Sequence, residues 1–227
     1  MVRVQEHYYK ELYSLFWDNN FVPEETQIER LAFLAELISE KNKVVNLVSR
    51  KDTESLIENH IFITAFISKF LPDKCSRFLD IGTGGGFPGL PVAIVKPHLK
   101  GVLADSTGKK IDSVKEFIEK LKLGNVTAVN SRVEAPEFIN LYRNSFDLIL
   151  SRATVPLLLL ISYSLPLIKE KAYLAAIKGG DLEDEFQKAV LKYKPYIKKH
   201  TIFELAYKPG NIRNQKGKKL VLLELNK

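Results

Sequence analysis

Residues 78–89 read Phe78-Leu79-Asp80-Ile81-Gly82-Thr83-Gly84-Gly85-Gly86-Phe87-Pro88-Gly89, the densest chemical signal in the chain. A short apolar strand leads into the glycines, and an apolar helix opens at their end. Glycine allows positive φ and close approach of a ligand to the backbone. The start of the following helix offers free N–H groups and a partial positive charge. The stretch therefore predicts a ligand-binding turn, in preference to a tight turn without a ligand.

Two glycine patterns overlap in this turn. Gly84, Gly86 and Gly89 satisfy G-x-G-x-x-G, a dinucleotide fingerprint, and Asp105 follows at about the 20-residue spacing of its ribose-binding acid. The alternative, Asp80-x-Gly82-x-Gly84-x-Gly86, is similar to the nucleoside-binding loop of S-adenosylmethionine-dependent methyltransferases. Asp80 suits that second cofactor, which has a cationic amino group near the loop and no pyrophosphate.

Acids follow three successive predicted strands. Asp80 ends the first strand, Asp105 ends the second before Ser106, and Glu134 follows the third after Val133. We expect Asp105 to accept the ribose hydroxyls, Glu134 to face an adenine amino group, and a backbone N–H of Val133 or Glu134 to meet a ring nitrogen. A helix N-cap for Asp105 and a solvated loop position for Glu134 are the alternatives. Carboxyl ends of parallel strands share one edge, so all three acids would reach one crevice.

Short apolar runs alternate with amphipathic stretches through the rest of the chain. This rhythm predicts an α/β fold, a Rossmann-like, mostly parallel sheet with an antiparallel last strand. The predicted strands are 77–81, 102–105, 126–130, 146–150 and 172–177, followed by an antiparallel pair at 201–206 and 220–225. The predicted helices between them are 90–95, 110–121 and 155–168.

Three helical stretches open the chain, the second over 24–41 and the third from about 52 to 70. We divide the chain into a helical extension, 1–72, and a sheet domain, 73–227, packed as one unit. His60 lies on the apolar side of the third helix, a position that favours a satisfied core histidine over a ligand, and its function stays open.

Composition predicts a soluble cytoplasmic protein without a metal site, a membrane span or an internal disulfide. Apolar residues make up 45%, the longest apolar run contains Pro156, the start has no apolar leader, and Cys75 is the single cysteine. The net charge is +7, and residues 192–227 carry nine Lys and one Arg against two Glu. This basic end suits a polyanion such as nucleic acid, although a solvated, solubilising surface explains it equally well. We assume a monomer.

From about Leu31 to Gly179 the chain resembles the bacterial 16S ribosomal RNA guanine-N7 methyltransferases, also called the glucose-inhibited division protein B family. The most specific marks are Gly86-Phe87-Pro88-Gly89 and Ser151-Arg152-Ala153. Further marks are Asp105-Ser106 with Lys109-Lys110, Arg132-x-Glu134, Phe146-Asp147 and Lys178-Gly179.

The resemblance implies a class I S-adenosylmethionine-dependent methyltransferase that methylates a guanine of small-subunit ribosomal RNA. It implies that Gly82, Phe87, Val133, Glu134 and Arg152 contact the cofactor. Our full set of expected cofactor-binding residues is Asp80, Gly82, Gly84, Gly86, Phe87, Asp105, Ser106, Val133, Glu134 and Arg152.

Guanine N7 has a free lone pair at neutral pH, so no general base is expected and no catalytic residue is assigned. Arg152 is the candidate for positioning the substrate; the alternative is a structural ion pair with Asp147 or Glu134. The expected RNA-binding residues are Lys109, Lys110, Arg132, Lys178 and Arg213. An NAD-linked oxidoreductase, which would use the same loop, and a non-catalytic RNA-binding module are the alternative functions.

Overall fold

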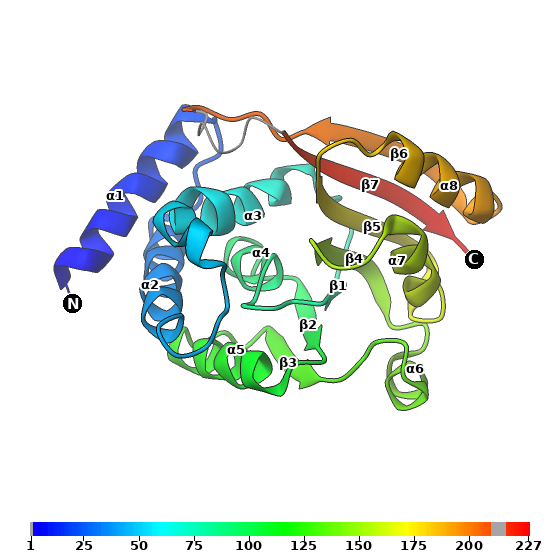
Figure 1. Cartoon of the computed structure of the whole chain (residues 1–227), viewed down its shortest axis with the longest axis horizontal. Coiled ribbons are helices and arrows are strands. Elements are labelled where there is room, and N and C mark those ends of the chain that lie inside the picture. Colours follow the sequence, from blue (N-terminus) through cyan, green and yellow to red (C-terminus); the bar gives the residue numbers. More distant parts are fainter. Residues whose placement is uncertain (1, 210–216) are drawn as a thin grey trace.

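The computed structural model describes residues 2–209 and 217–227, with the side chains of 2–4, 50 and 51 set aside. One seven-stranded sheet forms its centre (Figure 1). Its strands are β1 (Arg77–Ile81), β2 (Lys100–Asp105), β3 (Val126–Asn130), β4 (Phe146–Arg152), β5 (Ile168–Gly179), β6 (Ile197–Glu204) and β7 (Lys218–Asn226).

The helices flank this sheet. The α-helices are α1 (Val2–Asp18), α2 (Glu25–Lys41), α3 (Ile63–Phe66), α4 (Gly89–Val95), α5 (Gly108–Lys120), α6 (Pro136–Tyr142), α7 (Leu157–Ser164) and α8 (Glu183–Tyr193). Three further segments are the 3₁₀-helix η1 (Arg50–Ser55), the π-helix η2 (Ile57–Phe62) and the 3₁₀-helix η3 (Ile67–Phe70).

The strand order is β3-β2-β1-β4-β5-β7-β6. Strands β1 to β5 pair in parallel, and β7 is antiparallel to both β5 and β6. The strand order reverses between β1 and β4, and parallel sheets bind ligands at such a point. The predicted fold class, with its antiparallel last strand, is confirmed.

Helices cover both faces of the sheet, so the central strands are buried on both sides and read as continuous apolar runs. On one face α4, α5 and the N-terminal helices share a core with Phe78, Leu148 and Leu220. On the other face α6, α7 and α8 pack against a second core around Leu79, Ile149 and Val221. The division into 1–72 and 73–227 stays a prediction; its boundary falls in the connection between η3 and β1.

The third N-terminal helix is less regular than the single helix that we expected over 52–70. The chain passes instead through η1, η2, α3 and η3. The Thr64 hydroxyl donates to the carbonyl oxygen of His60, one turn earlier. Such hydrogen bonds compete with the helical ladder and bend helices. The segment therefore changes helix type along its length, and Asn59 is buried within it.

Elsewhere the differences concern boundaries and two missed helices. The predicted helix over 155–168 is wrong at its end, because α7 stops at Ser164 and β5 begins at Ile168. Pro166 lacks the N–H that a continued helix requires. The predictions omitted α6 and α8.

Candidate functional site

The glycine loop leaves β1 at the point where the strand order reverses. The N–H groups of Gly82 and Thr83 both donate to the Ala104 carbonyl oxygen, at 2.9 and 3.0 Å, which ties the loop to the end of β2. Gly82 has φ +68°, and a Cβ there would lie 2.4 Å from Cγ2 of Thr154. Only glycine meets both conditions, so the loop is held against the segment that follows β4.

Asp80 lies beneath this loop and is fully buried. Its Oδ2 accepts hydrogen bonds from the Thr83 hydroxyl at 2.6 Å and from the Gly89 N–H at 2.8 Å. Its Oδ1 has no hydrogen-bonding partner among the described residues. Burial raises the pKa of Asp80 to about 7, although these two hydrogen bonds lower it. Asp80 therefore supports the loop from below.

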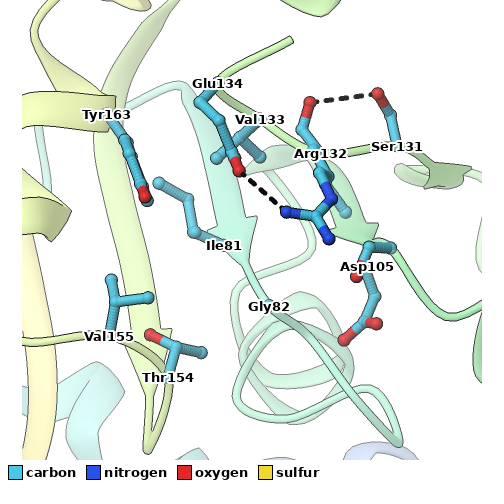
Figure 2. A pocket seen from close by; sticks show the side chains of 12 residues that line it. Ile81, Gly82, Asp105, Ser131, Arg132, Val133, Glu134, Thr154, Val155 and Tyr163 are labelled. Carbon is cyan, nitrogen blue, oxygen red and sulfur yellow. Dashed lines mark hydrogen bonds and ion pairs between the residues drawn. The ribbon is translucent and has the colours of Figure 1, made fainter.

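A pocket of about 280 Å³ opens beside the loop, at the carboxyl ends of β1 to β3 (Figure 2). Small-molecule sites measure roughly 300–1,000 Å³, so this volume suits one part of a cofactor, such as a nucleoside. The lining residues are Ile81, Gly82, Ala104, Asp105, Ser106, Ser131, Arg132, Val133, Glu134, Thr154, Val155 and Tyr163. The sequence-predicted residues that meet here are Gly82, Asp105, Ser106, Arg132, Val133 and Glu134.

Asp105 connects the pocket to the glycine loop. Its Oδ2 accepts the Gly84 N–H at 2.9 Å, and its Oδ1 accepts the Thr107 N–H at 2.8 Å. A carboxylate offers about four acceptor sites, so two bonds leave capacity for the hydroxyls of a ligand. The helix N-cap that we considered as the alternative role of Asp105 is not formed, because the N-cap of α5 is Thr107. Asp105 instead closes a local turn through the Thr107 N–H and also lines the pocket.

Arg132 and Glu134 form the rim of the pocket opposite Tyr163 (Figure 2). Nη1 of Arg132 lies 3.7 Å from Oε1 of Glu134, in an exposed ion pair of little energetic weight. Val133 is buried between them in the chain and presents an apolar surface to the pocket. The site therefore combines apolar walls with acceptors.

Four of the expected cofactor-binding residues lie outside this lining: Asp80, Gly84, Gly86 and Phe87. Gly84 and Gly86 shape the loop with φ +55° and +97°. Phe87 is buried on the side of the N-terminal helices, where its ring lies 5.3 Å from that of His60.

Arg152, a fifth such residue, also lies outside the lining, at the end of β4. Its guanidinium carbon lies 5.9 Å from the centroid of Phe87. The alternative ion pair with Asp147 or Glu134 is absent from the described contacts, since Asp147 bonds Lys169 and Glu134 pairs with Arg132. Burial lowers the pKa of Arg152 to about 10, a value at which it stays charged at neutral pH.

His60 is buried, as expected of a core histidine, but it is not satisfied. Its Nε2 has no hydrogen-bonding partner among the described residues and lies 4.0 Å from Oδ2 of Asp52. Burial, followed by the charges of Arg152 and Lys218, lowers the pKa of His60 to about 2. The imidazole is therefore neutral at physiological pH.

The expected RNA-binding residues differ in their exposure to solvent. Lys109, in the first turn of α5, is exposed and Lys110 is half-buried. Lys178 is 13% exposed, and its ammonium donates to Glu185 at 2.7 Å and to the Val155 carbonyl at 2.8 Å. Its donors therefore stabilise the contact of β5 with α8, and its role in holding RNA stays a prediction. Arg213 lies outside the described residues.

The predictions missed six of the pocket residues, namely Ile81, Ala104, Ser131, Thr154, Val155 and Tyr163. Ser131 follows β3 directly and could have been found from the same strand-end signal that indicated Glu134. Tyr163 comes from α7 and reaches the pocket only through the packing of that helix. No local pattern in the sequence marks it.

Comparisons with known proteins show the family of this chain. The family model of GidB, rRNA small subunit methyltransferase G, matches residues 27–209. The chain belongs to this family. Ribosomal RNA small subunit methyltransferase G of Chlorobium luteolum is 40% identical over 180 residues, covering 79% of this chain and 74% of the relative. The Haemophilus influenzae protein of the same name is 39% identical over 184 residues, covering 80% and 87%.

Solved structures show the same fold. A SAM-dependent methyltransferase from Aquifex aeolicus superposes with a TM-score of 0.56 at 20% identity, covering 82% of this chain and 98% of that one. A SAM-dependent O-methyltransferase from Thermotoga maritima gives a TM-score of 0.56 at 16% identity, covering 86% and 71%. The predicted family, enzyme class and fold are confirmed, and the comparisons support neither the oxidoreductase nor the non-catalytic module.

Within 2–209 and 217–227, no three metal-ligating side chains gather as a metal would require. No described helix combines the length and apolar composition needed to cross a bilayer.

Proposed function

We propose that this protein transfers a methyl group from S-adenosylmethionine to N7 of a guanine in small-subunit ribosomal RNA. The observation that carries the proposal is the pocket at the ends of β1 to β3, with Asp105 and Val133 in its lining, in a member of this family. RNA of this class also implies a cytoplasmic enzyme.

The pocket fits the adenosine part of the cofactor. The remaining acceptor sites of Asp105 would take the ribose hydroxyls, beside the exposed hydroxyl-bearing Ser106. Val133 would pack against the adenine ring, and Glu134 would accept from its amino group. Gly82 would let the cofactor approach the backbone, since a side chain there is excluded.

Asp80 takes a different role from the one expected for it. Its carboxylate is enclosed by Thr83 and Gly89 and would not touch the cofactor directly. We infer that it acts on binding through the loop, together with Gly84 and Gly86, whose positive φ values set the course of the backbone.

The reaction requires placement more than acid–base chemistry. When bound, S-adenosylmethionine supplies an electrophilic methyl group on a sulfonium. Guanine N7 is unprotonated at neutral pH, so the chain has to hold it in line at roughly 3–3.5 Å, without a general base. His60 does not serve as an acid at this pH, because burial keeps it neutral.

The RNA would approach across the open rim. Lys109 and Lys110, on α5, and Arg132, at the pocket, lie on that side and carry charge suited to phosphates. Arg213 belongs to the basic segment between β6 and β7 and remains a candidate from the sequence alone.

Mass spectrometry tests the proposal directly. Unmethylated small-subunit ribosomal RNA is incubated with the protein and S-adenosylmethionine, and its nucleosides are then analysed. We expect one equivalent of 7-methylguanosine per RNA. Methylation at another atom, or no methylation of naked RNA or assembled subunits, would contradict the proposal.

A further inference from the structure

A group of basic side chains lies where β4 ends and β7 begins; two of them are charged, and the third, His60, is neutral. It comprises Arg152 from β4, Lys218 from β7, and His60 from η2. None of the three lines the nucleoside pocket. Arg152 packs over Phe87, and Phe87 contacts His60, so the group adjoins the glycine loop.

The antiparallel direction of β7 brings Lys218 to this edge. Parallel strands end at the carboxyl edge of the sheet, whereas β7 begins there, with Lys218 paired to Gly179 at the end of β5 (Figure 1). The Lys218 ammonium donates to Oδ1 of Asn59 at 2.9 Å, on the face covered by the N-terminal helices. Side chains alternate along a strand, so the next residue, Lys219, faces the other way and pairs with Glu204 at 3.3 Å.

Neither cation of this group is held by a carboxylate in the described contacts. Nη1 of Arg152 is buried and has no hydrogen-bonding partner among the described residues. The charge of Asp52 raises the pKa of Arg152, but the Asp52 side chain is 43% exposed and accepts a hydrogen bond from the Ser49 hydroxyl. Lys218 hydrogen-bonds the neutral Asn59.

This arrangement is costly while no anion is bound. Burial and the charge of Arg152 lower the pKa of Lys218 to about 8, although Glu58 and Asp52 act in the opposite direction. Removing charges from water without pairing them is unfavourable. An oxyanion that accepted from both side chains would relieve the repulsion and satisfy the free guanidinium nitrogen.

We propose that Arg152 and Lys218 form an oxyanion subsite that binds a phosphate of the substrate RNA and so positions the target nucleotide for transfer. The inference rests on the proposed function and adds Lys218 to it as a positioning residue. The other available oxyanion is the carboxylate of the cofactor. We favour the phosphate because Lys218 comes from the basic C-terminal stretch of the chain, residues 192–227, whose charge suits a polyanion.

The test compares Lys218→Met with Lys219→Met, its neighbour of equal charge on the opposite face. Steady-state kinetics with an RNA fragment gives KM and kcat, and calorimetry gives the Kd of S-adenosylmethionine. We expect Lys218→Met to raise KM for RNA about tenfold, the usual loss for one charge-assisted hydrogen bond, with an unchanged Kd for the cofactor. Lys219→Met should resemble the wild type in both.

Three outcomes overturn the inference. Equal KM values for the two variants would remove Lys218 from the substrate site. A raised Kd for S-adenosylmethionine with unchanged KM for RNA would assign the oxyanion to the cofactor. Lys218→Arg keeps the charge and should have a KM for RNA close to that of the wild type. A KM as high as that of Lys218→Met would show that only the packing of the side chain is involved. An inactive wild type would instead refute the proposed function.

A binding measurement covers the case in which Lys218→Met folds poorly. Guanosine 5′-monophosphate and guanosine are compared as inhibitors of the wild type. The monophosphate should inhibit at about tenfold lower concentration, and Lys218→Arg should preserve that preference. Equal inhibition by the two compounds would exclude a phosphate subsite.

Discussion

The two halves of the sheet's carboxyl edge are built in opposite ways. At the ends of β1 to β3 an open pocket is lined by acceptors, with Asp105 and Glu134 among them. Between the end of β4 and the start of β7 lies a half-buried cationic group around Arg152 and Lys218. A nucleoside with hydroxyl and amino donors suits the first half, and a phosphate suits the second. We therefore propose that the polarity of this edge places the cofactor at the first half and the RNA at the second.

The acceptor half should depend most on Gly82. Gly82→Val would place a β-branched residue at φ +68° and against Thr154, so we expect a loss of affinity for S-adenosylmethionine of about 100-fold or more. Calorimetry measures this loss, with Gly124→Ala as the control, because a Cβ on Gly124 meets nothing within 4 Å. Wild-type affinity in Gly82→Val would mean that the cofactor binds elsewhere.

We expect a substitution of Asp105 to have the next largest effect on cofactor affinity. Asp105→Asn keeps the shape but removes the charge, and hydrogen bonds to charged groups contribute about 1.5–3 kcal/mol. We therefore expect the Kd of S-adenosylmethionine to rise about tenfold or more, with the affinity for RNA unchanged. Asp112→Asn, on the exposed side of α5, is the matched control. A weakened RNA affinity with intact cofactor binding would reverse the assignment of the two halves.

A variant of Asp80 tests whether this residue supports the glycine loop or contacts the ligand directly. Its folded pKa, about 7, exceeds its ordinary value of 3.8, so the stability from its protonated form is complete below pH 4 and is lost as the pH rises to 7. Each pKa unit corresponds to about 1.4 kcal/mol. Asp80→Asn should lack this decline and bind the cofactor within about twofold of the wild type.

Urea unfolding at pH 4.5 and pH 8 measures the difference. The wild type should lose a few kcal/mol of unfolding free energy relative to Asp80→Asn between these values. Parallel pH profiles would show that Asp80 is ionised throughout. A strong loss of cofactor affinity in Asp80→Asn would return this acid to the ligand.

Lys109 should give the smallest effect, because it is exposed and is one of several cations that we propose to face the RNA. Lys109→Ala should reduce the slope of log affinity against log salt by about 0.7 to 0.9, the contribution of one phosphate contact. Lys115→Ala, exposed further along α5, is the control. Identical slopes for both variants would remove α5 from the RNA interface.

The same division explains how far the sequence could be read. The acceptor half is local in the chain: each strand leads directly into its glycines or its acid, so Gly82, Asp105 and Glu134 were identified from pattern alone. The burial of Asp80 could not be predicted in the same way. The pattern shows where a strand ends, but it does not show which side chain the loop encloses.

The cationic half is nonlocal. Lys218 reaches Asn59 across 159 positions, and only the antiparallel entry of β7 brings the two together. Lys178, adjacent to a glycine and predicted to bind RNA, is paired with Glu185 on a helix that the predictions omitted. Long-range pairing of this kind has no signature in periodicity or spacing.

A crystal structure of the complex with S-adenosylhomocysteine tests the central assignment most directly. We expect the ribose hydroxyls within hydrogen-bonding distance of Asp105, the adenine ring against Val133, and the sulfur directed toward the end of β4. An adenosine bound at any other surface, or a pocket at Asp105 left without ligand when the crystals are saturated with it, would contradict the assignment.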